Sequence, residues 1–79
     1  MKKTYISIIA VQKRSESAVK VQELLSEYSD LIDLRYGIHE KNEDRGLIIL
    51  KIKGARALVN TFNSTLNDLK DVKAQCVEL

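Results

Sequence analysis

Residues 5–11 read YISIIAV and residues 47–53 read LIILKIK. β-Branched and other large apolar residues dominate both stretches, which predicts a strand in each. Successive side chains of a strand point to opposite faces of its sheet, and in these two strands apolar residues occupy both faces. A small sheet that is covered by helices on one side buries only one face, so the second apolar face needs another chain to cover it. The sequence therefore predicts self-association.

The segments between these two strands have other periods. Residues 12–15 (QKRS) are polar, and we expect a turn and a helix N-cap there. Residues 32–39 alternate between apolar and polar side chains, which predicts a half-buried edge strand, and residues 40–46 form a charged hairpin loop. From residue 17 the apolar residues recur at helical spacing, and the predicted helical stripe contains Ala18, Val21, Leu24, Leu25, Tyr28 and Leu31.

A second helical stripe and a last short strand complete the chain. The stripe contains Leu58, Val59, Phe62, Leu66 and Leu69, and residues 72–79 form the strand. The order strand, helix, strand, strand, helix, strand predicts an α+β, ferredoxin-like sandwich, with a four-stranded antiparallel sheet and two helices on one face. The first and third strands are central in that topology. We expect their outward rows, and hence the oligomer face, to include Ile9, Val11, Leu47 and Ile49.

Length and composition limit the number of domains, the kinds of partner and the cellular location that we expect. With 79 residues, no proline and no glycine- or serine-rich linker, residues 1–79 are predicted to form a single domain. A net charge of +2 gives no clustered basic surface, so we expect no direct binding to nucleic acid. No apolar stretch approaches the roughly 20 residues that cross a bilayer, so we expect no membrane partner. The single cysteine, Cys76, cannot form an intrachain disulfide, which favours a cytoplasmic protein.

Three polar positions near the end of the second strand are candidates for binding. Arg35 and Gly37 share the polar row, where a guanidinium can hold a carboxylate or a partner chain and a glycine lets another backbone approach. The structural alternative is an exposed charge and a bulge. His39 is a candidate for ligand or metal contact, and its alternative is a solvated pair with Glu40.

Two further candidates lie in the turn before the first helix. Lys13 and Arg14 precede a predicted helix N-terminus, where free amides and two cations can bind an anion. A solvated turn is the alternative interpretation.

A known family resembles this chain over nearly its whole length. The resemblance rests on LRYGI at residues 34–38, a charged hairpin, LIIL at residues 47–50 and a second helix that leads to VKA at residues 72–74. In these features the chain is similar to the small regulators of the iron-only hydrogenase system. The resemblance implies an ACT-like domain, similar to the C-terminal domain of nickel-responsive repressors, which assembles through its sheets. It also implies a regulatory, ligand-responsive or scaffold role.

The nickel site of those repressors does not carry over to this chain. It needs a His-x-His on the second strand and a cysteine near the start of the third, because square-planar nickel requires converging nitrogen and sulfur donors. Here Gly37 stands two residues before His39, the hairpin has no cysteine, and Cys76 lies in the last strand. We therefore predict no metal site and no cofactor.

No arrangement of residues predicts catalysis. Cys76 lies among apolar residues without a nearby base, and no carboxylate has an apolar setting that would raise its pKa. The leading hypothesis is a non-enzymatic regulatory module that acts as a homodimer or homotetramer, with a ligand site at the subunit interface. The alternative is an ACT-like protein that binds an amino acid or a small anion as effector through Lys13, Arg14 and Arg35.

Overall fold

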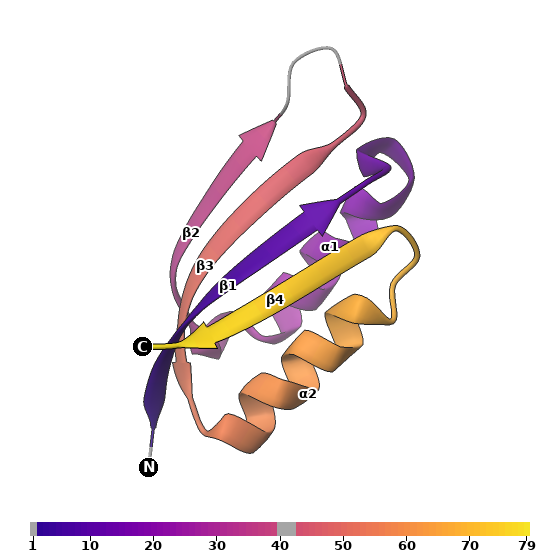
Figure 1. The fold of residues 1–79 in the computed structure, drawn as a ribbon. Coiled ribbons are helices and arrows are strands. Elements are labelled where there is room, and N and C mark those ends of the chain that lie inside the picture. Colours follow the sequence, from indigo (N-terminus) through magenta and orange to yellow (C-terminus); the bar gives the residue numbers. More distant parts are fainter. Residues whose placement is uncertain (1, 40–42) are drawn as a thin grey trace.

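The computed structural model describes residues 2–39 and 43–79. Its element order confirms the predicted ferredoxin-like α+β fold (Figure 1). A short 3-10 turn, η1, joins the first helix to the second strand. The elements are β1 (Lys3–Val11), α1 (Arg14–Glu27), η1 (Ser29–Leu31), β2 (Ile32–His39), β3 (Gly46–Gly54), α2 (Arg56–Asn67) and β4 (Val72–Glu78).

The sheet has the strand order β2-β3-β1-β4, and every neighbouring pair is antiparallel. The central position predicted for the first and third strands is confirmed. Both helices cover the same face of the sheet, and no helix or strand of the described residues covers the opposite face (Figure 1). We call the uncovered side the open face.

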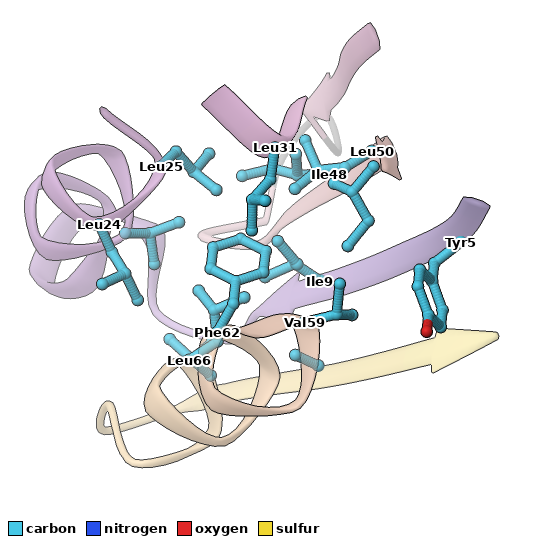
Figure 2. Close-up of a cluster of buried hydrophobic side chains, with 14 of the residues drawn as sticks. Tyr5, Ile9, Leu24, Leu25, Leu31, Ile48, Leu50, Val59, Phe62 and Leu66 are labelled. Carbon is cyan, nitrogen blue, oxygen red and sulfur yellow. The ribbon is translucent and has the colours of Figure 1, made fainter. Parts of the chain in front are cut away.

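The core lies between the helices and the sheet (Figure 2). Phe62 of α2 is fully buried, and its ring centroid lies 4.9 Å from that of Tyr28 at the end of α1. Each fully buried aliphatic or aromatic side chain contributes about 1.5–3 kcal/mol relative to an exposed one. The predicted stripes hold at most positions, although Leu58 is exposed. The largest fully buried apolar side chains are Ile9, Val21, Leu25, Leu50, Ile52, Val59, Phe62 and Leu66.

The side chains of Ile9 and Val11 point into this core, so their predicted place on the oligomer face is wrong. The inner row of β1 also contains Tyr5 and the fully buried Ser7, and the other row contains Ile6, Ile8 and Ala10. Because a shift of one residue exchanges the two faces of a strand, a strand that is apolar on both sides does not reveal which row faces the helices. Leu47 and Ile49, in contrast, lie on the open face as expected, where they are half-buried.

A β-bulge in β2 changes the face on which its apolar residues lie. Ile32 pairs with Ile52 of the core row, but Leu34 pairs with Lys51 of the outer row, so Asp33 is an extra residue. Ile32 packs against the core, while the side chains of Leu34 and the alternate residues after it lie on the open face. The strand is therefore exposed from Asp33 to His39 rather than half-buried. The apolar residues of the open face are Ile6, Ile8, Ala10, Leu34, Tyr36, Ile38, Leu47, Ile49 and Val77.

Candidate functional site

A cavity of about 270 Å³ lies between α1 and the ends of β2 and β3 that adjoin the hairpin. Three of the five candidate residues, Arg14, Gly37 and His39, line it together. Its apolar wall includes Val11 and Val21, both buried. The cavity lies on the helix side of the sheet and brings together more of the candidate residues than a second, smaller cavity among the described residues.

Gly37 faces the cavity because of its register in the sheet. It pairs with Ile48, whose side chain belongs to the core row, so the polar row of β2 points towards the helices. A Cβ atom at Gly37 would meet nothing within 4 Å. The expected close approach of another backbone is therefore absent within the described chain, and the bulge lies at Asp33 instead. Because Gly37 has no side chain, the space beside it remains part of the cavity.

Arg14, the first residue of α1, brings a cation to the same cavity. Its Cδ lies 3.4 Å from the position that a Cβ of Gly46 would occupy, so the aliphatic part of the side chain runs over the start of β3. Within residues 2–39 and 43–79, no carboxylate forms an ion pair with the Arg14 guanidinium. Gln22 and the exposed His39 are the other polar side chains around the cavity.

The N-terminus of α1 is capped from the hairpin rather than from its own turn. The residue before the helix, Lys13, makes no side-chain capping bond. The carboxylate of Asp44 accepts hydrogen bonds from the Ser15 backbone N–H, at 2.8 Å, and from the Ser15 hydroxyl. The backbone N–H of Arg14 donates to the Asp44 carbonyl at 2.9 Å.

This cap lies at the helix end where the sequence offered either an anion site or a solvated turn. Hydrogen bonds from the Ser15 hydroxyl and backbone N–H lower the pKa of Asp44, and the charges of Arg14 and His39 lower it further. Sequence reasoning missed Asp44 in this role because it lies 29 positions after Ser15. The N-cap residue, Lys13, lies within residues 12–15 as predicted, although the carboxylate that accepts the capping hydrogen bonds belongs to Asp44 outside them.

Lys13 and Arg35 do not line the cavity. Both are exposed. Arg35 pairs with Leu50 and lies two residues before Gly37 on the row that faces the helix side. Its interpretation as an exposed charge at the edge of the sheet fits this position, and a role in contact with a partner stays a prediction.

Two ionisable groups outside the cavity, Glu78 and Cys76, have structural rather than chemical roles. Glu78 accepts hydrogen bonds from Lys3 at 3.2 Å and from Arg56 at 2.6 Å, which ties the end of β4 to β1 and to the start of α2. These two bonds lower the pKa of Glu78. Burial raises the pKa of the half-buried Cys76 thiol, which keeps it protonated and poorly nucleophilic.

The described residues contain neither a metal-binding group nor a membrane-spanning helix. No group of three or more histidine, cysteine, aspartate or glutamate side chains gathers there in a way that could hold a metal ion. In the same part of the chain, no helix has the length and the apolar character that crossing a membrane requires.

A four-stranded antiparallel sheet with two helices on one face defines a ferredoxin-like α+β domain. A family model described as "TM1266-like: Iron-only hydrogenase system regulator, putative" matches residues 2–76. The chain belongs to this family, which confirms the resemblance found in the sequence.

A solved structure supports this assignment. The chain is similar to the uncharacterized protein TM1266 from Thermotoga maritima, with a TM-score of 0.94 and 29% sequence identity. The match covers 100% of this chain and 99% of that chain. No curated protein matches the chain significantly.

Proposed function

We propose that the chain is a non-enzymatic regulatory module that acts as a homo-oligomer, with subunits that pack through their open faces. The description of its family supports the regulatory role. The observation that carries the assembly is the apolar character of the open face, which no helix or strand of the described residues covers.

The apolar residues of this face are contiguous across three strands. Ile8 and Ile49 lie opposite each other on β1 and β3, and Ile49 in turn lies opposite Tyr36 on β2. Tyr36 is 61% exposed and its neighbour Leu34 62% exposed, which is unusual for large apolar side chains on adjacent positions of one face.

Covering this face would supply free energy for assembly. A patch on the order of 400 Å² on each chain would contribute about 10 kcal/mol at ~25 cal/mol/Å², before the costs of association are subtracted. A two-fold axis places the same patch on both subunits, so one apolar face serves both partners. The homodimer is the simplest product, and a homotetramer needs a second contact.

Assembly offers a mechanism of regulation. A ligand that touches two chains shifts the equilibrium towards the assembled state only by the difference in its affinity for the two states. Arg35 lies on edge strand β2 in the row that faces the helix side, so it is a candidate for such a shared contact at the edge of the sheet and not on the open face.

The test is a charge placed in the middle of the open face. We expect Ile49→Lys to lower the mass measured by multi-angle light scattering, because its ammonium would be buried between subunits. Val19→Lys is the matched control, since Val19 is 68% exposed on α1 and lies on the helix side. An Ile49→Lys protein with the mass of the wild type would contradict assembly through this face.

Effector binding is the second candidate function, and the cavity is the observation that favours it. Arg14, one of the three cations predicted to hold an amino acid or a small anion, lines this cavity. A thermal-shift panel of amino acids, small carboxylates and divalent metals tests it, because a ligand that binds the folded chain raises its melting temperature. No stabilisation by any member of the panel would leave the assembly function alone.

A further inference from the structure

We propose that the cavity between α1 and the β2–β3 hairpin binds a small aliphatic carboxylate, and that Arg14 and His39 hold the carboxylate. The inference rests on the effector-binding candidate function and names the class of its ligand. It does not depend on assembly, because Arg14 and His39 lie on the helix side of the sheet, although Ile38 and Leu47 belong both to the cavity lining and to the open face.

The dimensions and the wall of the cavity limit the ligand. Its volume of about 270 Å³ is below the ~300–1,000 Å³ of sites for drug-sized molecules, so the occupant has few non-hydrogen atoms. Val11, Val21 and Ile48 supply buried apolar surface. Such a wall favours an aliphatic body over a sugar or a phosphate ester.

The charges around the cavity select a carboxylate. Arg14 and His39 are the ionisable side chains among the described lining residues, and Gln22 adds a neutral hydrogen-bonding group. The Arg14 guanidinium has a planar fork of donors that matches a carboxylate. No acidic side chain lines the cavity in the described part of the chain, so the ammonium of an amino acid would lie there without a partner. This distinguishes a simple carboxylate from a zwitterion.

Asp44 does not take the place of the ligand. Its carboxylate accepts both hydrogen bonds of Ser15 at the end of α1, and it is absent from the lining of the cavity. The helix N-terminus is therefore satisfied within the chain. The charges of Arg14 and His39 act on Asp44, but among the described residues Arg14 forms no ion pair with it, so the guanidinium donors remain available to an anion in the cavity.

Gly37 is the second observation that points to a ligand. Glycine weakens the interior of a strand, and here neither a positive φ nor a close neighbour requires it. Its missing side chain keeps open the space next to Arg14 and His39. An alanine or valine would fit the backbone and would reduce the cavity.

The first test is an NMR titration of the 15N-labelled full chain with isovalerate, with the neutral isostere isovaleramide and with leucine. We expect isovalerate to shift the amide signals of Ala18, Val21, Gly37 and Gly46, and to leave those of Ala74 and Cys76 in β4 unchanged. We expect isovaleramide and leucine to bind at least 10-fold more weakly. Equal binding of isovalerate and isovaleramide would overturn the role of the charge.

Three variants locate the site. We expect Arg14→Gln to weaken isovalerate binding at least 10-fold, and Lys13→Gln to change it less than 2-fold, because Lys13 carries the same charge next to Arg14 but does not line the cavity. We expect Gly37→Val to abolish binding while the melting temperature stays within a few degrees of the wild type, since valine favours strands.

The outcomes separate this inference from the function on which it rests. Leucine binding in the cavity more tightly than isovalerate would overturn the ligand class and keep effector binding. Isovalerate binding that Arg14→Gln and Gly37→Val both leave unchanged would overturn the site. No binding by any of the small molecules in either panel would overturn both the inference and the effector-binding function, and would leave assembly untouched.

Discussion

The side-chain amide of Asn67 pairs with the backbone of Ala74 as a neighbouring strand would. Its Nδ2 donates to the Ala74 carbonyl at 2.9 Å, and the Ala74 N–H donates to its Oδ1 at 2.8 Å. β4 is an edge strand, so these backbone groups would otherwise face away from the sheet. The last residue of α2 therefore closes one position of this edge.

Loss of the Asn67 amide should destabilise the fold. We expect Asn67→Ala to lower the free energy of unfolding by about 1–3 kcal/mol, because the part-buried N–H and C=O of Ala74 lose their partners. Urea denaturation measures this change. Asn60→Ala, at an exposed position of the same helix, is the control and should change stability by less than about 0.5 kcal/mol. Equal effects of the two variants would contradict the role of the pairing.

The Asp44 cap should make stability depend on pH. The folded state lowers the pKa of Asp44, so its stabilising effect is fully present above the pKa of the unfolded chain, about 3.9, and is lost as the pH falls through the lower folded value. We expect wild type to be more stable than Asp44→Asn at pH 7, and the difference to shrink towards pH 3. Urea denaturation of both proteins across this range tests the sign. A difference that stays constant with pH would show that the charge of Asp44 does not stabilise the helix.

Gly54 should tolerate no side chain. A Cβ there would lie 2.8 Å from Leu31 Cδ2, and Leu31 is itself buried in the core. We expect Gly54→Ala to lower the free energy of unfolding by about 1–3 kcal/mol. Gly37→Ala is the matched control, because nothing lies within 4 Å of its Cβ position, and its thermal midpoint should equal or exceed that of the wild type. A thermal midpoint for Gly54→Ala equal to that of Gly37→Ala would exclude the clash.

Replacement of Asp71 by glycine should stabilise the folded protein. It has a φ of 60°, which is the left-handed region that favours glycine, and its carbonyl accepts a hydrogen bond from Gln12 N–H at 2.7 Å. We expect Asp71→Gly to raise the free energy of unfolding by about 0.5–1 kcal/mol and Asp71→Ala to lower it. Chemical denaturation compares the two variants. The reverse order would show that the aspartate side chain matters more than the backbone conformation.

The hydrophobic periods in the sequence were sufficient to predict the fold, but not which face of each strand lies against the helices. The helical stripes around Val21 and Phe62 and the alternation of residues 32–39 predict the element order, because each period belongs to one kind of element. The inner row of β1 could not be predicted, since it buries Ser7 and Tyr5 and leaves the more apolar Ile6 and Ile8 outside. The bulge at Asp33 has no signal in a single sequence.

Individual residues of the candidate site were predicted from the sequence, but not that three of them would line one cavity. Arg14, Gly37 and His39 were selected for three different reasons, and the fold brings them to one cavity. Val11 was expected on the open face and instead forms part of the cavity wall. Asp44 was missed because capping by a distant carboxylate depends on how the hairpin folds back on α1. Long-range contacts of this kind have no local pattern.

Because Asp33 is an extra residue in β2, the deletion of one codon from the gene would have a large structural effect. Loss of that single codon would keep the composition of β2 almost unchanged but would turn the strand over. Leu34, Tyr36 and Ile38 would then face the helices, and Arg35, Gly37 and His39 would face outwards. Relatives with a shorter connection at this point would therefore present the opposite row of side chains on each side of the sheet, even with identical residues along the strand.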